Sequence, residues 1–197
     1  MFDNELVSGK LKRWGRFLEK HSLPEWNSIP NYGLYMDQVV ALLTEYLEFL
    51  PPELRDDQLI TPAAINNYVR LGMLPEPERK RYYRIHMAYL IMISSLKTTL
   101  SLSRISQILP ATLSAEEFEA IYNSFVKRHM VASKYFIDRV KEIDGKILGK
   151  EEVNELQVED TLDLIFFSTG ISTYSKILAE KLILLDGKNI ENGGSIE

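Results

Sequence analysis

The chain has 197 residues, a formal net charge of −5 and no cysteine. Its content of 45% hydrophobic and 26% charged residues is typical of a globular protein and excludes a disordered or collagen-like chain. The lack of cysteine excludes disulfides, thiol catalysis and thiolate metal sites, and it fits a reducing cytoplasm. No stretch approaches the roughly 20 apolar residues of a membrane helix, and the N-terminal residues lack the apolar run of a signal peptide, so we expect a cytoplasmic protein without membrane contact.

The first 50 residues predict two helices and a loop. Residues 4–20 have the apolar spacing of an amphipathic helix, whose Lys and Arg residues form either a solvated face or a contact to an anionic surface. Two prolines and a glycine predict a loop over residues 21–33, with Trp26 filling a hollow in the core. The apolar residues from 34 to 50 predict a second helix, which Pro51-Pro52 ends.

Residues 61–110 predict three further helices. Thr61 is a good N-cap and Pro62 suits the first helical position, while Gly72 is typical of a helix end. The small buried face expected for this helix consists of Ile65, Tyr68 or Val69, and Leu71. Residues 73–83 contain two prolines and a basic cluster, which predicts a hairpin-like loop. Helices over about 84–100 and 102–109 follow, the latter capped by Ser101.

The C-terminal half predicts one long helix and a shorter one. Ser114 and Glu117 form a capping-box pattern that begins a helix reaching about residue 147. Its apolar residues recur at nearly heptad spacing: they are Phe118, Tyr122, Phe125, His129, Ala132, Phe136, Val140, Ile143 and Ile147. Residues 144–160 predict a connection, 161–185 an apolar helical region with Gly170 as a candidate break, and 186–197 a flexible tail. Strand patterns are nearly absent, so the predicted fold is all-α, mostly helical.

Two features of the long helix leave alternatives open. His129 lies on its apolar seam and is either a pH-sensitive element or, more simply, a core histidine. The aromatic residues of this half either line a pocket for a small-molecule effector or form core and dimer contacts; they are Phe118, Tyr122, Phe125, Tyr135, Phe136, Phe166, Phe167 and Tyr174.

Charge is concentrated in residues 61–110. Seven Lys or Arg residues stand there against Glu76 and Glu78, which gives a net charge of about +5, while the rest of the chain carries about −10. This contrast indicates a local surface for a polyanion.

A helix, a linker and a second short helix over residues 34–72 are typical of a helix-turn-helix. Asparagine side chains can read adenine, arginine can read guanine or hold phosphate, and the basic loop 76–84 suits the DNA backbone. We predict that helix 61–72 enters the major groove of double-stranded DNA and that the loop contacts the flanking backbone. The predicted DNA-binding residues are Thr61, Ala63, Asn66, Asn67, Tyr68, Arg70, Arg79, Lys80, Arg81, Tyr82 and Arg84.

Residues 65–75, I-N-N-Y-V-R-L-G-M-L-P, resemble the signature of MerR-type winged helix-turn-helix regulators. In that family a tyrosine and a charged pair precede Leu-Gly-Leu-Leu-Pro, and a basic wing ending in Arg-x-Tyr follows, a place that Lys80-Arg81-Tyr82 fills here. The residues that match the first motif are Tyr68, Leu71, Gly72, Leu74 and Pro75. Residues 101–109 resemble the fourth helix of the family. Asn66-Asn67 replaces the usual Arg-Tyr, so the resemblance implies DNA binding without promoter unwinding of the MerR kind, and the lack of cysteine excludes thiolate metal sensing.

A closer resemblance is to a bacterial family known as domain of unknown function 1836, over roughly residues 20–112. Its members look like LPxWxxxPxxxLYMDQVxxLL, then ITxxxINNYVxxxxxPxPxKxxY, then HxAYLIxI. The matching residues are Leu23, Pro24, Trp26, Pro30, Leu34, Tyr35, Met36, Asp37, Gln38, Val39, Ile60, Thr61, Ile65, Asn66, Asn67, Tyr68, Val69, His86, Ala88, Tyr89, Leu90 and Ile91. The resemblance implies a MerR-like DNA-binding domain and assigns no ligand.

The sequence therefore predicts a DNA-binding protein that acts as a transcriptional regulator and a homodimer. We expect an N-terminal helix and loop (1–33), a winged helix-turn-helix (34–110), a helical dimerisation or effector domain (111–185) and a tail (186–197). No cofactor or metal site is predicted, and the absence of catalytic motifs predicts no enzyme. The alternatives are a helical protein-interaction module that does not bind DNA and a small-molecule-binding helical protein.

Overall fold

The computed structural model describes residues 4–50, 60–148, 166 and 169–178. Contacts group the chain into two compact units, which we call the central unit (residues 23–127) and the terminal unit (residues 1–22 with 128–197). The central unit contains the whole of the predicted domain 34–110. The predicted tail, 186–197, lies outside the described residues.

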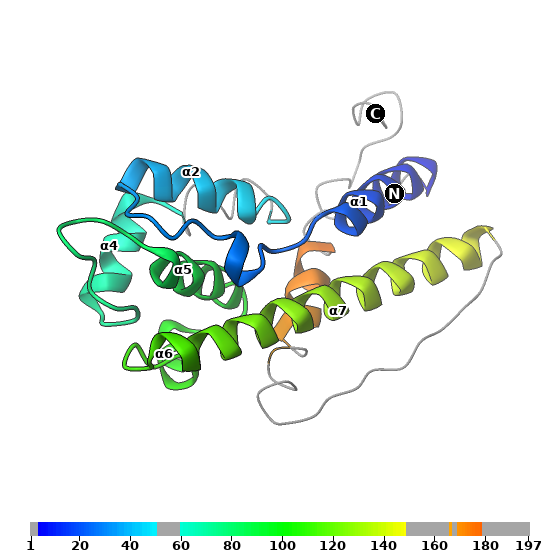
Figure 1. Cartoon of the computed structure of the whole chain (residues 1–197). Coiled ribbons are helices and arrows are strands. Elements are labelled where there is room, and N and C mark those ends of the chain that lie inside the picture. Colours follow the sequence, from blue (N-terminus) through cyan, green and yellow to red (C-terminus); the bar gives the residue numbers. More distant parts are fainter. Residues whose placement is uncertain (1–3, 51–59, 149–165, 167–168, 179–197) are drawn as a thin grey trace. The chain divides into compact units, whose positions relative to one another are not determined.

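The described residues are mostly helical, which confirms the predicted class, and they contain isolated β-bridges but no longer strand. In chain order the elements are α1 (Asn4–Lys20), the short 3-10 helix η1 (Trp26–Ser28), α2 (Met36–Tyr46), α4 (Pro62–Arg70), α5 (Arg84–Leu96), α6 (Leu102–Ile108) and α7 (Ala115–Leu148) (Figure 1). Residues 169–178 are also helical. No helix among the described residues has the length and apolar character needed to cross a membrane.

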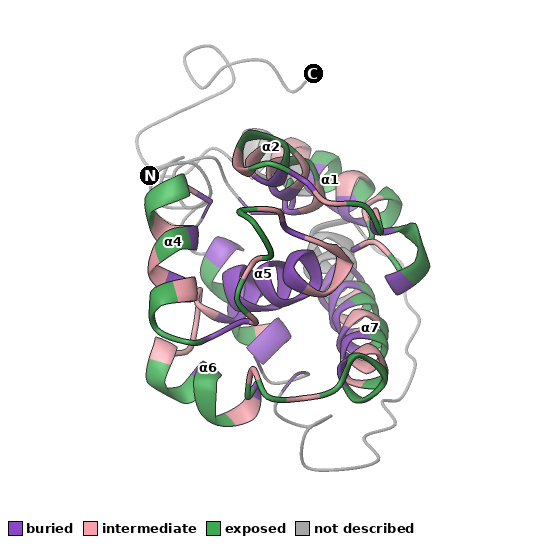
Figure 2. Cartoon of the chain, turned by 60° about the vertical axis from the view of Figure 1, so that its left-hand side comes forward, coloured by how far each residue is buried: buried purple, intermediate pink, exposed green. Residues whose placement is uncertain are grey.

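The centre of the central unit is α5, which is buried all round from His86 to Leu96. A helix that is apolar on every side must be enclosed by its neighbours, and Figure 2 shows α5 in purple with α2, α4 and α6 about it. The ring of Tyr89 stacks on Phe118 of α7 with 3.7 Å between centroids. Its hydroxyl donates a 2.9 Å hydrogen bond to the Pro110 carbonyl, so the buried phenol keeps a partner.

The loop before α2 is part of this core. Trp26 is buried against Phe118 and Tyr122, with centroid distances of 6.3 and 5.9 Å. The Tyr122 hydroxyl donates a 2.8 Å hydrogen bond to the Pro24 carbonyl. The predicted role of Trp26 is confirmed, and these contacts join residues 23–33 to the same packed body as the helices that follow.

Helix ends follow the predicted capping residues. The Thr61 hydroxyl accepts a 3.0 Å hydrogen bond from the Ala64 N–H, and Gly72 has the left-handed φ of 63° that favours glycine after a helix. At the start of α7, the Ser114 N–H donates to Glu117 Oε2 at 2.9 Å while the Glu117 N–H donates to Ser114 Oγ at 3.3 Å. Both bonds of the predicted capping box are therefore present.

Two sequence predictions are wrong. Leu71, expected on the buried face of its helix, is 51% exposed, because α4 ends at Arg70 and Leu71 is the C-cap residue, beyond the last helical position. Gly170 does not break its helix, since residues 169–178 are continuously helical. A Cβ at position 170 would lie 2.8 Å from the Ala132 Cβ, so this glycine allows two helices to approach closely.

Within the terminal unit, aromatic rings join α1, α7 and the 169–178 helix. Trp14 meets Phe136 edge-on at 5.1 Å, and Phe136 stacks on Tyr174 at 5.5 Å. The Tyr174 hydroxyl lies 3.2 Å from Nε2 of the buried His129. The seam predicted for α7 is thus buried as far as Phe136, while the side chains of Val140, Ile143 and Ile147 lie outside the described part.

Candidate nucleic-acid interface

One side of α4 is exposed and polar. Ile65 and Tyr68 face the core, whereas Ala63, Asn66 and Arg70 are exposed and recur at spacings of three and four residues. These three predicted residues therefore share one stripe along the helix. Asn67 lies at its flank, where its Oδ1 accepts a 2.7 Å hydrogen bond from Arg70 Nη2 and holds that guanidinium close to the helix.

The basic loop ends in a tight turn at residues 78–81. Glu78 and Arg81 form an antiparallel bridge, and the Arg81 N–H donates a 2.8 Å hydrogen bond to the Glu78 carbonyl. The two residues between them, Arg79 and Lys80, have φ of 49° and 63°. Hairpin turns of this kind normally carry Asn-Gly, because both central residues need positive φ. Two exposed cations instead occupy the tip.

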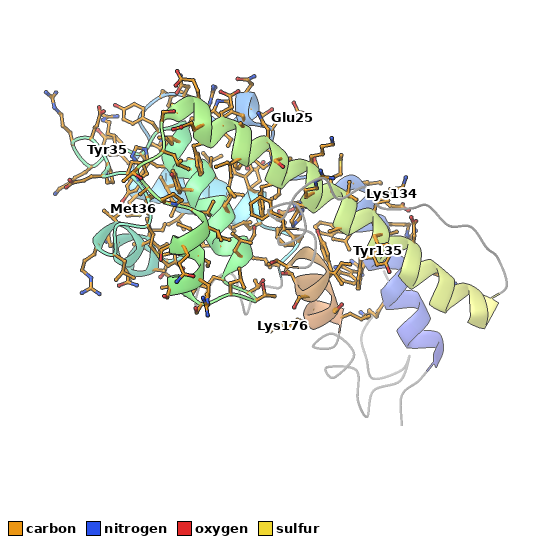
Figure 3. All side chains as sticks on the ribbon, turned by 90° about the horizontal axis from the view of Figure 1, so that it is seen from below. Glu25, Tyr35, Met36, Lys134, Tyr135 and Lys176 are labelled. Atoms are coloured by element: carbon orange, nitrogen blue, oxygen red, sulfur yellow. The ribbon has the colours of Figure 1, made fainter. Side chains whose placement is uncertain are left out.

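A backbone bridge fastens the loop to the segment before α2. The Leu34 N–H donates to the Tyr82 carbonyl at 2.8 Å, and the Tyr82 N–H donates to the Leu34 carbonyl at 2.9 Å. Figure 1 shows this loop and α4 at the same end of the central unit, and Figure 3 shows Tyr35 and Met36, at the start of α2, beside the loop. The backbone of the turn is thus fixed to the segment before α2, at the same end of the central unit as α4.

Three of the predicted DNA-binding residues, Tyr68, Tyr82 and Arg84, make contacts inside the central unit. The rings of Tyr68 and Tyr82 are buried, which raises the pKa of Tyr68 to about 12 and the pKa of Tyr82 above its ordinary value. Arg84 is turned inward, with Nε donating to the Ile29 carbonyl at 2.9 Å and Nη1 to Asn27 Oδ1 at 3.3 Å. The two rings are therefore part of the core, and Arg84 is tied to the loop that precedes α2.

His86, in the first turn of α5, contacts the backbone of the loop. Its Nδ1 accepts a 2.9 Å hydrogen bond from the Tyr83 N–H, and its Nε2 lies 3.4 Å from the Glu76 carbonyl. Burial lowers the pKa of His86, and hydrogen bonds to the backbone at Glu76 and Tyr83 oppose that shift. The neutral ring has the one acceptor and one donor nitrogen that this arrangement requires. His86 thus caps the first turn of α5 and connects it to the loop.

One contact of this surface, between Arg81 and Tyr35, is not predicted from the sequence. Arg81 Nη2 donates a 2.6 Å hydrogen bond to the Tyr35 hydroxyl, and its guanidinium carbon lies 4.2 Å from the centre of the Tyr35 ring. The two residues are 46 positions apart, so no local pattern relates them. The only available signal was Tyr35 itself, an aromatic residue directly before a helix.

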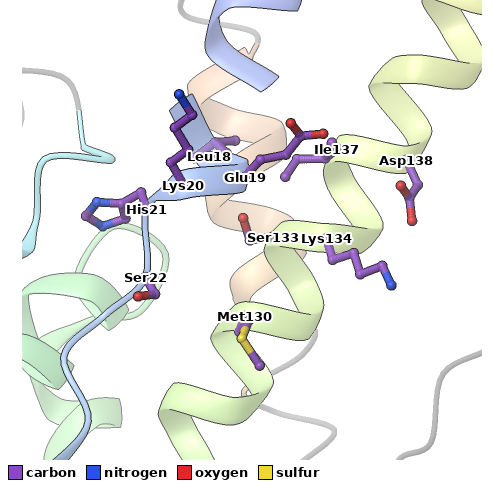
Figure 4. Close-up of a pocket in the computed structure, with 10 residues that line it drawn as sticks. All are labelled: Leu18, Glu19, Lys20, His21, Ser22, Met130, Ser133, Lys134, Ile137 and Asp138. Atoms are coloured by element: carbon purple, nitrogen blue, oxygen red, sulfur yellow. The ribbon is translucent and has the colours of Figure 1, made fainter. Parts of the chain in front are cut away.

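A separate pocket of about 360 Å³ lies in the terminal unit, between the end of α1 and the middle of α7 (Figure 4). Its charged lining is mixed, with Glu19 and Asp138 against Lys20 and Lys134. None of the aromatic residues predicted to line an effector pocket is among its lining residues. Over the described ranges, no group of three or more His, Asp or Glu side chains gathers as a metal site would require.

Comparison with protein families identifies the family of this chain. A family model described as a domain of unknown function, DUF1836, matches residues 24–125, just over half of the chain. Comparison with curated proteins and with solved structures finds no significant similarity. The matched range coincides with the central unit to within two residues at either end. The chain therefore belongs to the DUF1836 family.

Proposed function

We propose that this protein binds double-stranded DNA as a transcriptional regulator, using a winged helix-turn-helix of the MerR kind. In this proposal α4 enters the major groove and the 78–81 turn lies on the flanking phosphate backbone. The observation that carries the proposal is the turn itself, where Arg79 and Lys80 take a left-handed conformation that places two cations at an exposed tip. Backbone strain of this kind persists mainly where a site uses it.

The exposed stripe of α4 has the chemistry of base readout. The Asn66 amide matches the paired donor and acceptor of adenine, and the methyl group of Ala63 matches the methyl group of thymine. The Arg70 guanidinium, which donates a 2.7 Å hydrogen bond to Asn67, has the chemistry to bind guanine or phosphate. An α-helix with its side chains is about 10–12 Å across, which suits a major groove about 12 Å wide.

A second copy of the chain is part of the proposal. One module of this size covers a short stretch of DNA, and regulators gain specificity by placing two modules on half-sites about 34 Å apart. We place the dimer contacts in the terminal unit because most of its residues after α1 fall in the region 111–185 that the sequence predicts for dimerisation or effector binding. The alternative is a protein-interaction module. It predicts that the residues of α4 and the 78–81 turn bind an acidic protein and do not bind DNA.

The turn is tested by changing Arg79 and Lys80 to alanine together in the full chain. Affinity for a DNA duplex of mixed sequence should fall, because two phosphate contacts are lost. The slope of log K against log salt should decrease by about 2, since each phosphate contact contributes roughly 0.9. Fluorescence anisotropy over a range of KCl concentrations measures both quantities.

The matched control changes one arginine and one lysine that are exposed elsewhere, Arg16 on α1 and Lys127 on α7. This double variant has the same net charge as the first and should keep the slope of the unmodified chain. Equal slopes for both variants would reject the turn as a DNA contact. If the unmodified chain binds neither mixed duplex nor any fragment selected from genomic DNA, the protein-interaction alternative is favoured.

A further inference from the structure

We infer that Tyr35 and Gly33 are positioning residues that hold the Arg81 guanidinium ready for a phosphate group of the DNA backbone. The inference rests on the proposed function and extends it, because it adds the segment before α2 to the interface of α4 and the turn. It also gives Arg81 a different role from its neighbours at the tip: Arg79 and Lys80 are exposed side chains, whereas Arg81 is held in one orientation.

The backbone pairing brings these residues together. Leu34 and Tyr82 exchange two hydrogen bonds of 2.8 and 2.9 Å across an antiparallel bridge. In an antiparallel pair the next residue of one strand faces the preceding residue of the other, so Tyr35 stands opposite Arg81. The 2.6 Å bond between the Tyr35 hydroxyl and Arg81 Nη2 agrees with that register.

Three contacts fix the guanidinium. Its carbon lies 4.2 Å from the centre of the Tyr35 ring, Nη2 donates to the Tyr35 hydroxyl at 2.6 Å, and Nη1 donates to the Gly33 carbonyl at 3.2 Å. A guanidinium has five N–H donors. The two hydrogen bonds use two of them, which leaves three N–H groups for an acceptor outside the protein.

Position 33 has no room for a side chain, because the Arg81 side chain occupies the space beside it. A Cβ at position 33 would lie 2.7 Å from the Arg81 Cδ and 3.0 Å from its Cβ. Cβ atoms essentially never come within 3.0 Å of another heavy atom, so any larger residue would displace the arginine stem. The absence of a side chain at position 33 therefore leaves room for the stem of Arg81 in its observed position.

Phosphate is the ligand that fits the remaining donors. A planar guanidinium with its orientation fixed binds a phosphate through paired hydrogen bonds and loses little rotational freedom when it does so. The two exposed cations of the turn immediately precede Arg81 in the chain, which makes the surrounding potential favourable for an anion. Tyr35 is 51% exposed although Arg81 lies against its ring, so the pair is accessible from solvent.

A purely structural role for the pair makes a different prediction. If Tyr35 and Arg81 only brace the turn, their loss should lower thermal stability and leave the salt dependence of DNA binding unchanged. If Arg81 holds a phosphate, the salt slope changes while the melting temperature stays close to that of the unmodified chain, because exposed pairs contribute little to stability.

The experiment uses the full chain, a mixed-sequence duplex, and anisotropy over a range of KCl concentrations, with melting followed by circular dichroism. Arg81→Ala should lower the salt slope by about 1. Arg81→Lys keeps the charge but cannot stack or form the paired bonds, and Tyr35→Leu keeps the arginine but removes its support. Each should weaken binding by about tenfold, the effect of losing a well-placed hydrogen bond to a charged group.

Conservative and matched variants complete the test. Tyr35→Phe keeps the ring and removes only the 2.6 Å hydrogen bond. It should therefore lower the affinity for DNA less than Tyr35→Leu does. Gly33→Ala changes no charge and should resemble Tyr35→Leu. Tyr32→Leu removes a tyrosine from the same loop that is 64% exposed, and it should bind as the unmodified chain does.

The inference is overturned if Arg81→Lys and Tyr35→Leu bind as tightly as the unmodified chain, or if Arg81→Ala lowers the melting temperature without changing the salt slope. In both cases the unmodified chain still binds DNA and the proposed function stands. Complete absence of DNA binding by the unmodified chain would reject the proposed function together with this extension of it.

Discussion

His129 is enclosed in the terminal unit, where the Tyr174 hydroxyl lies 3.2 Å from its Nε2. Burial lowers the pKa of His129 to about 3, and the charge of His21 adds to the shift. The neutral ring is therefore the form that fits the folded protein, as expected for a core histidine. Protonation must instead favour the unfolded chain, where a histidine titrates near pH 6.5.

The stability of the fold should consequently depend on pH. Because the folded pKa of His129 lies below the unfolded one, its contribution is complete above about pH 6.5 and is lost as the pH falls toward 3. Between about pH 7.5 and pH 5 the loss from this group should be about 2 kcal/mol. Urea unfolding at the two pH values measures it, with His129→Gln as the variant that cannot take up the proton. Equal losses in both proteins would show that the dependence comes from other groups.

Single residues also mark what the sequence could not predict. Thr61 and Gly72 were assigned correctly because capping depends on neighbours three or four positions away. The sequence names Tyr68 both as a candidate for the buried face and as a DNA-binding residue, and the structure buries it on the same side as Ile65. The contact between Tyr35 and Arg81 joins residues 46 positions apart. Only the three-dimensional pairing of the loop with the segment before α2 reveals it.

The turn at residues 78–81 has a backbone conformation that lowers the stability of the fold. Most residues lose roughly 1–2 kcal/mol in a left-handed conformation, whereas glycine and asparagine tolerate it. Arg79 and Lys80 both take this conformation, with φ of 49° and 63°. The loop sequence alone predicted a basic, hairpin-like segment, but it could not predict that its most basic residues occupy the least favourable positions.

Replacing Arg79 with asparagine and Lys80 with glycine should therefore stabilise the protein. The expected gain is about 1–2 kcal/mol in the free energy of unfolding, because Asn-Gly is the preferred pair for such a turn. DNA affinity should fall at the same time, since two cations are removed. Chemical denaturation and anisotropy on the same sample test the two effects. A variant that is less stable than the unmodified chain would mean that the arginine and lysine side chains hold the turn through contacts of their own.

At the scale of the whole molecule, the residues that match the family model are nearly the same as the residues of the central unit. The match covers residues 24–125 and the central unit covers 23–127. The predicted boundaries at 33/34 and 110/111 enclose a smaller region. Local patterns could not show that Trp26 and Tyr122, which flank that region, pack against each other at 5.9 Å. Helix α7 was predicted as one element, and it contributes residues to both units.

A fragment of residues 23–127 should fold without the rest of the chain. It keeps the buried α5, the stack of Tyr89 on Phe118 and the first part of α7. Circular dichroism should show a helical protein with a cooperative thermal transition. If the terminal unit supplies the dimer contacts, the fragment should bind mixed duplex as a monomer and more weakly than the full chain. An unfolded fragment would show that the central unit depends on residues outside it.

The charge contrast along the chain has a kinetic consequence. Residues 61–110 carry about +5 while the remainder carries about −10, and the turn presents Arg79 and Lys80 to solvent. If the protein binds DNA as proposed, the acidic remainder should repel a duplex, whereas the turn should hold it long enough for it to rotate into register. Association should then be fast and oriented at low ionic strength, and it should slow steeply as salt shortens the reach of these charges.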